Sequence, residues 1–239
     1  MSDVKSAGRI YAVGVGPGDP ELLTRKGERI LRQAGVICAP AASPLDSSHA
    51  LSIAEPFIDR NRQEVITQVF PMRMDQAGLE EFWEEAASAV AERVRGGVDV
   101  AFITIGDPFL YSTFLYLYPI FREKYPDIPV EVVPGISSIT AAAIAGGVPL
   151  GKASERIAVI PAAFDQENLR QTLEEFDTVV LMKMSRVFDG IYELLLELGL
   201  ERNAVFVSRV GTPEQEVVFD LATLVGKKLD YLSLLIVRK

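Results

Sequence analysis

The chain has 239 residues, of which 49% are hydrophobic, and it carries 24 lysines and arginines against 33 aspartates and glutamates. This length allows one or two domains with a sizeable core, and we expect two. The net charge of −9 disfavours a nucleic-acid partner, because phosphate backbones repel an acidic surface.

Cysteine and histidine usage excludes several kinds of site. Cys38 is the only cysteine, which rules out an intrachain disulfide and a cysteine metal cluster, and we expect it to fill space in a strand. His49 is the only histidine and follows a segment rich in proline and serine, so we predict no metal site. No apolar stretch approaches the ~20 residues that span a bilayer, and residues 1–8 lack the apolar segment of a signal peptide. We therefore expect a soluble, cytoplasmic protein with no membrane partner.

Along the first half of the chain, apolar runs alternate with segments of helical spacing. Strands are predicted at 9–15, 36–39, 64–70 and 98–105, and helices at 22–33, 79–95 and 109–121. Strands that alternate with helices indicate a parallel sheet with helices on its faces. This half is expected to form one α/β domain.

The charged, proline-punctuated segment around 118–129 predicts a boundary, with domains at 1–120 and 121–239. In the second half, strands are predicted at 130–133, 156–160, 178–182, 204–208, 216–220 and 231–237, and helices at 137–145, 167–175 and 187–198. The fold class expected is therefore two α/β domains with mostly parallel sheets.

The first predicted strand runs into the turn Gly14-Val15-Gly16-Pro17-Gly18-Asp19-Pro20. Turns at the carboxyl ends of parallel strands are where open α/β sheets bind small molecules. A dinucleotide fingerprint is disfavoured, because Asp19 stands where the third glycine should be and the strand 36–39 ends without an acidic residue. The glycines could also serve turn geometry alone.

Two further turns follow predicted strands. In Gly106-Asp107-Pro108-Phe109-Leu110-Tyr111 a carboxylate lies in a constrained turn, where it could bind a ligand or cap the following helix. In Pro134-Gly135-Ile136-Ser137-Ser138, amides and hydroxyls stand at a helix start, which suits either a ligand or a plain cap.

Together with Leu181-Met182-Lys183-Met184 and Val210-Gly211-Thr212-Pro213-Glu214-Gln215, these turns resemble the tetrapyrrole methylase family, the S-adenosylmethionine-dependent enzymes of corrin and sirohaem synthesis. The resemblance runs from residue 9 to 237. Within the family, segments 106–113 and 133–138 are most similar to the carbon-20 methyltransferases of precorrin-2 or its cobalt form. The resemblance implies a methyltransferase of cobalamin and porphyrin-type biosynthesis, with a cofactor cleft between two α/β domains, and usually a homodimer.

The resemblance also implies the residues that bind S-adenosylmethionine and its product S-adenosylhomocysteine. They are Pro17, Ile105, Gly106, Asp107, Leu110, Ser137, Ser138, Met182, Lys183 and Gly211. Many relatives have Tyr-Met-Gly at positions 182–184, so the side chain that meets the adenine, from Met182, Lys183 or Met184, stays open. The apolar segment 109–118 is a candidate dimer surface.

A sulfonium methyl is already an activated electrophile, so orientation supplies most of the catalysis and no nucleophilic side chain is needed. A base must still remove a proton from the methylated carbon, and the candidates are Asp107, Tyr111 and His49. Because the implied substrate carries many carboxylates, a local basic lining is expected. Its candidates are Arg73, Lys152, Lys183, Arg186 and Arg209.

The sequence is also compatible with other functions. Within the same fold, the alternatives are a methylase of a different tetrapyrrole carbon and a diphthine synthase, whereas the acidic charge disfavours an RNA methylase. From other classes, they are a non-catalytic tetrapyrrole or nucleotide carrier and an NAD-dependent oxidoreductase, the latter on the glycines alone. Whether the substrate already contains cobalt is not encoded in these motifs.

Overall fold

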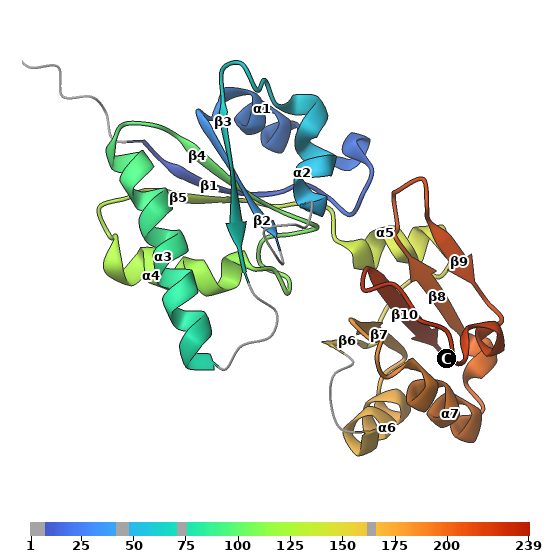
Figure 1. Ribbon diagram of the computed structural model, residues 1–239. Coiled ribbons are helices and arrows are strands. Elements are labelled where there is room, and N and C mark those ends of the chain that lie inside the picture. The colour runs from blue at the N-terminus through green and yellow to red at the C-terminus, as the bar shows by residue number, and fades with distance from the viewer. Residues whose placement is uncertain (1–7, 42–47, 71–75, 162–165) are drawn as a thin grey trace, which may run out of the picture. The chain divides into compact units, whose positions relative to one another are not determined.

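The computed structural model describes residues 8–41, 48–70, 76–161 and 166–239 (Figure 1). The chain folds as two units, residues 1–137 and residues 138–239. None of the helices in the described ranges is both long and apolar enough to cross a membrane.

The first unit is built on a parallel five-stranded sheet of order β3-β2-β4-β1-β5. Its strands are β1 (Ile10–Gly14), β2 (Val36–Ala41), β3 (Glu64–Val69), β4 (Val100–Thr104) and β5 (Val130–Val133). Every residue of β4 is buried, because helices cover the sheet on both faces. The parallel arrangement predicted from the alternation of elements is confirmed here.

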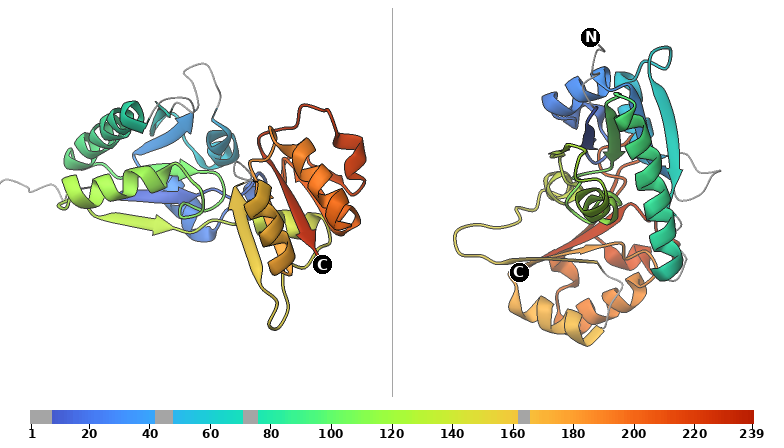
Figure 2. Two further views of the ribbon diagram at one scale, coloured as in Figure 1. Left: turned by 90° about the horizontal axis from the view of Figure 1, so that it is seen from below. Right: turned by 90° about the vertical axis from the view of Figure 1, so that its left-hand side faces the viewer.

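Helices α3 (Gln76–Arg95) and α4 (Phe114–Lys124) pack on one face of this sheet. Figure 2 shows them lying together on one side of the strands. Their core contacts include Phe102 and Cys38, whose side chain is fully buried, as expected of a residue that fills a strand. On the other face lie α1 (Arg25–Gln33) and α2 (His49–Ala54). Helix α2 had no counterpart among the predicted elements.

Two helices begin later than predicted, and in each case a side chain accepts a backbone hydrogen bond near the new start. Thr24 accepts a hydrogen bond from the N–H of Gly27 at 3.1 Å and so starts α1, after the short 3-10 turn Pro20–Leu22. Helix α4 begins at Phe114 rather than at 109, since Asp107 binds the N–H of Phe109 within a separate turn.

The second unit contains a five-stranded sheet of order β6-β7-β10-β8-β9. Its strands are β6 (Ile157–Pro161), β7 (Thr178–Met182), β8 (Ala204–Ser208), β9 (Glu216–Val218) and β10 (Ser233–Arg238). Only β6 and β7 pair in parallel, while β10 runs antiparallel to both β7 and β8, and β9 runs antiparallel to β8. This sheet is therefore mixed, unlike the mostly parallel sheet expected.

Helices α6 (Gln166–Glu175) and α7 (Phe188–Leu198) cover one face of the second sheet and share its core. Helix α5 (Ser138–Ala145) contacts β10, and none of its residues belongs to the core shared with α6 and α7. Immediately after α5, the backbone at Gly146 approaches Val205 of β8 so closely that an added Cβ would lie 3.1 Å from Cγ1 of that valine. The neighbouring strand residues Ala204 and Phe206 point instead into the core formed with α6 and α7.

The two units do not divide at the boundary expected from the charged segment. Residues 121–137, placed by the sequence in the second domain, contain β5, and β5 pairs in parallel with β1 from Ile10↔Val130 to Val13↔Val133. Backbone hydrogen bonding to a central strand thus keeps this segment in the first unit, and the second unit begins at Ser138 with α5.

Candidate active site

Three turns meet at one edge of the first sheet. Strands β4, β1 and β5 are neighbours and parallel, so their carboxyl ends lie together. The turn after β1 is joined to the turn after β4 by two backbone hydrogen bonds, from Gly106 N to Gly16 O at 2.8 Å and from Gly16 N to Gly106 O at 3.4 Å. The motifs at 14–20 and 106–111, which are far apart in the sequence, thus form one structure.

Two glycines in these turns are required by backbone packing. A Cβ added to Gly135 would lie 2.0 Å from the carbonyl oxygen of Gly106, and one added to Gly14 would lie 2.4 Å from the same oxygen. Gly106 itself has a φ of 67°, in the region that favours glycine. The glycines at this edge therefore let three chain segments come into contact, which no larger residue would permit.

The Asp107 side chain links the turn after β4 to the turn after β5 by hydrogen bonds. Its Oδ1 accepts a hydrogen bond from the N–H of Phe109 at 2.8 Å, and its Oδ2 accepts one from the N–H of Gly135 at 3.0 Å. Each carboxylate oxygen therefore already has a backbone donor, although a carboxylate offers about four acceptor positions in total. The side chain has a positioning role within this edge, and its service as a base stays a prediction.

The other predicted site residues of this part of the chain lie in or next to the same three turns. Pro17 is buried, whereas Ile105, Leu110 and Ser137 are half-buried. Ser138 opens α5 and belongs to the second unit. Tyr111 is exposed and has a φ of 52°, an uncommon left-handed conformation for a residue with a side chain.

In the second unit, the predicted residues gather at the edge where β7 and β8 end. These two strands point the same way, because each is antiparallel to β10. Met182 ends β7 and is followed by Lys183 with a φ of 57°, and β8 is followed by Arg209 with a φ of 48° and Gly211 with a φ of 81°. Left-handed backbone at residues other than glycine is costly and is often found at functional sites.

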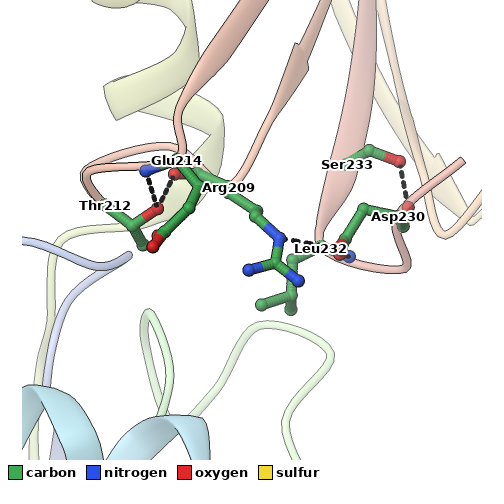
Figure 3. A network of polar contacts seen from close by, with 6 residues as sticks. All are labelled: Arg209, Thr212, Glu214, Asp230, Leu232 and Ser233. Carbon is green, nitrogen blue, oxygen red and sulfur yellow. Dashed lines mark hydrogen bonds and ion pairs between the residues drawn. The ribbon is translucent and has the colours of Figure 1, made fainter.

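A hydrogen-bond network surrounds Arg209 (Figure 3). Its Nε donates to Oδ2 of Asp230 at 2.7 Å, and the Oγ1 of Thr212 donates to its carbonyl oxygen at 2.9 Å. The hydrogen bond and negative charge of Asp230 raise the pKa of Arg209 above its ordinary value. Asp230 was not among the predicted site residues; the only sequence signal for it is an acidic residue directly before the last apolar run.

The remaining basic candidates are dispersed. Arg186 is exposed and follows β7 at the same edge as Arg209. Lys152 is exposed and lies in the segment that leads into β6, whose first residues are at the opposite edge of the sheet. Arg73 lies outside the described residues. The structure thus brings Lys183, Arg186 and Arg209 to one edge and separates Lys152 from them.

Residues 9–225 match the family described as tetrapyrrole (corrin/porphyrin) methylases. The chain is 34% identical, over 97% of both chains, to cobalt-precorrin-2 C(20)-methyltransferase of Salmonella typhimurium. It is 30% identical to precorrin-2 C(20)-methyltransferase of a Sinorhizobium species, over 99% of this chain and 97% of that protein.

Solved structures of the same fold agree with this assignment. A structure of uroporphyrin-III C-methyl transferase from Thermus thermophilus, complexed with S-adenyl homocysteine, superposes with a TM-score of 0.68 at 25% identity, over 97% of this chain and 98% of that one. A cobalt precorrin-4 methyltransferase superposes with a TM-score of 0.74 over 96% of this chain and 94% of that one; at 21% identity this likeness concerns the fold alone. With the sequence match over residues 9–225, these comparisons establish that the chain belongs to the tetrapyrrole (corrin/porphyrin) methylases.

Proposed function

We propose that this protein transfers a methyl group from S-adenosylmethionine to carbon 20 of cobalt-precorrin-2 or precorrin-2, in cobalamin biosynthesis. The observation that carries the proposal is the 34% identity to a cobalt-precorrin-2 C(20)-methyltransferase along 97% of both chains. A match over the full length includes all of the turns at the two sheet edges, and not one isolated motif.

The residues at the first edge fit a ligand with a flat aromatic ring and a charged amino-acid end. Ile105 and Leu110 offer half-buried apolar surface, while Ser137 and the turn backbone offer polar groups. The proposed cofactor set in this part of the sequence also includes Pro17, Gly106, Asp107 and Ser138. From the edge of the second sheet it includes Met182, Lys183 and Gly211. When bound, S-adenosylmethionine supplies a methyl group on a positively charged sulfur.

The protein's contribution is to hold the reactants, because orientation of two reactants can contribute about 7–11 kcal/mol. A covalent enzyme intermediate on cysteine is not part of the proposal, since Cys38 is fully buried and burial raises the pKa of its thiol to about 12. For the proton lost from the methylated carbon, the proposed acceptors remain Asp107, Tyr111 and His49. Of these, Tyr111 and His49 are exposed.

We also propose that the protein is a cytoplasmic homodimer. Support comes from an aromatic surface formed by α4, the turn before it and Trp83 of α3. Tyr116 of α4 is 51% exposed and stacks on Trp83, with ring centroids 4.3 Å apart, and Phe109 in the turn before α4 is 48% exposed. Apolar surface of this kind is typical of protein interfaces. The proposed occupant of this surface is a second copy of the chain.

The methyl transfer is tested by incubating the protein with methyl-labelled S-adenosylmethionine and either precorrin-2 or cobalt-precorrin-2, followed by mass spectrometry of the product. We expect one added methyl on at least one of the two substrates, and the pair of reactions identifies which metal state is used. Binding of substrate without transfer of label would instead favour a tetrapyrrole carrier. Calorimetric titration should detect S-adenosylhomocysteine and not NAD; tight binding of NAD would overturn the proposal.

A methylase of another tetrapyrrole carbon is the second candidate. It is favoured by 27% identity over 95% of this chain to siroheme synthase of Saccharophagus degradans, of which the match covers 48%. The position of the new methyl group, located by NMR of the isolated product, decides between the two candidates.

A further inference from the structure

We propose that Arg209 binds a carboxylate group of the tetrapyrrole substrate through its two terminal nitrogens, and that Asp230 positions the guanidinium for this contact. The inference rests on the proposed function, since it assumes a substrate that carries carboxylates. It assigns one subsite and one positioning residue within the second domain.

The backbone of Arg209 is held in place on both sides. Its N–H donates to the carbonyl oxygen of Leu232 at 2.8 Å, and its own carbonyl oxygen accepts from both the N–H of Thr212, at 3.0 Å, and the hydroxyl of Thr212. These bonds hold the residue at a φ of 48°, a conformation that costs free energy for any residue except glycine. A glycine would meet the backbone requirement here, yet the chain places an arginine.

The side chain of Arg209 is oriented by one nitrogen only. Nε donates to Oδ2 of Asp230 at 2.7 Å, and Oδ1 of Asp230 is in turn held by the N–H of Leu232 at 2.7 Å. No residue in the described ranges accepts a hydrogen bond from the Nη1 or Nη2 of Arg209. Figure 3 shows these two nitrogens at the end of the side chain, and neither is joined by a dashed line to another residue drawn. The Arg209 side chain is 40% exposed, so its two terminal nitrogens are accessible from solvent.

Arg156 provides a contrast within the same domain. It lies just before β6, at the opposite edge of the sheet, and its terminal nitrogens donate to Oε1 and to the carbonyl oxygen of Glu175, at 3.0 and 2.5 Å. Both terminal nitrogens of Arg156 are therefore engaged in hydrogen bonds within the protein. The two terminal nitrogens of Arg209 have no such acceptor in the described residues and can bind a partner outside the chain.

The two terminal nitrogens of the Arg209 guanidinium are suited to bind a carboxylate. Two parallel N–H groups of a guanidinium bind the two oxygens of a carboxylate in a bidentate, charge-assisted pair. A chain with a net charge of −9 needs a local cation to accept a polyanionic substrate. With Nε tied to Asp230, the remaining two nitrogens are pre-oriented, which reduces the entropy lost on binding.

The test compares Arg209→Gly, Arg209→Lys and Asp230→Asn with the wild type, and uses Arg156→Ala as the matched control. Glycine at 209 accepts the left-handed backbone without strain, so this variant should fold. Affinity for cobalt-precorrin-2 is measured by absorbance titration at several salt concentrations, affinity for S-adenosylhomocysteine by calorimetry, and folding by thermal melting.

We expect Arg209→Gly to weaken cobalt-precorrin-2 binding roughly tenfold to a hundredfold, the usual effect of losing a charge-assisted hydrogen-bond pair, and to reduce its salt dependence. Arg209→Lys should recover only part of the loss. Asp230→Asn should weaken binding by a smaller factor and add nothing in the Arg209→Gly background, since it acts through that arginine. S-adenosylhomocysteine affinity should stay unchanged in all variants, and Arg156→Ala should match the wild type.

The outcomes separate this inference from the proposed function. Wild-type affinity and salt dependence in Arg209→Gly, in a protein that methylates its substrate, would overturn the inference and leave the function standing. Equal losses of tetrapyrrole and S-adenosylhomocysteine affinity would indicate a general structural role and would also overturn it. If the wild-type protein binds no tetrapyrrole, both proposals fail together.

Discussion

Oδ2 of Asp107 accepts a hydrogen bond from the backbone N–H of Gly135, 28 residues farther along the chain, at 3.0 Å. The bond joins the turn after β4 to the turn after β5, two segments that are separated in the sheet by β1. The carbonyl oxygen of Gly106 occupies the space where side chains at Gly14 and Gly135 would otherwise be. The proposed cofactor turns are therefore held by one carboxylate and by backbone contact.

Asp107→Ala should destabilise the protein and weaken cofactor binding together. It leaves the N–H groups of Phe109 and Gly135 without their acceptor, at a cost of about 1–3 kcal/mol if solvent does not replace it. Asp107→Asn should be intermediate, because an amide keeps one acceptor and turns its NH₂ group toward a backbone donor. Urea unfolding and calorimetry with S-adenosylhomocysteine measure the two effects. Wild-type values for both in Asp107→Ala would show that the hydrogen bonds do not hold the turns.

Gly135→Ala should be strongly destabilising, by about 3 kcal/mol or more, because its Cβ would fall 2.0 Å from a backbone oxygen that has little room to move. Gly190→Ala is the matched control. Gly190 lies in α7. Apart from the helix's own backbone, no atom of the described residues lies within 4 Å of its added Cβ, and alanine there should stabilise the helix by about 0.5–1 kcal/mol. Chemical unfolding of both variants checks the contrast, which similar stabilities would disprove.

Cys38 should resist alkylation by iodoacetamide at pH 8 in the native protein and react only on unfolding, since its side chain is fully buried. Burial raises the pKa of the folded-state thiol to about 12, above that of an exposed thiol. Because the folded pKa is the higher one, this group's contribution to stability is complete below about pH 9 and is lost as the pH rises toward 12.

The alkaline effect of Cys38 is isolated by comparison with Cys38→Ala, which lacks the thiol. The wild type should lose stability between pH 9 and pH 12 more steeply than this variant, by about 1.4 kcal/mol per pH unit. Parallel pH profiles in urea unfolding, or rapid alkylation of the native protein, would contradict the predicted burial effect.

Tyr116→Arg should shift a homodimer toward monomer, because it places a charge on the aromatic surface proposed as the interface. Ile144→Arg is the control: Ile144 is 82% exposed on α5, outside that surface, and its replacement should leave the association unchanged. Sedimentation velocity measures the oligomeric state. Fluorescence of Trp83, the only tryptophan, reports on the stack with Tyr116 and should change on dilution of the wild type. A monomeric wild type, or equal dissociation of both variants, would rule out this interface.

The local elements followed from the sequence to a large degree. Runs such as Val130–Val133, Thr178–Met182 and Ala204–Ser208 are strands with the predicted bounds, because apolar and β-branched residues there fit a buried sheet. A short helix gives a weaker pattern in the sequence. Helix α2 follows a proline- and serine-rich segment and has only six residues, too few for a clear period.

The sequence by itself determined where the strands lie, which turns contain the site motifs, and which family the motifs resemble. Only the tertiary structure decided that β5 joins the first sheet, that the second sheet is mixed, that Asp107 binds Gly135, and that Asp230 binds Arg209. The physical reason is the distance along the chain between the residues that interact. Strand formation depends on a few neighbouring residues, whereas strand pairing and side-chain hydrogen bonds join residues that are distant in the chain and become neighbours only once the sheet order is set.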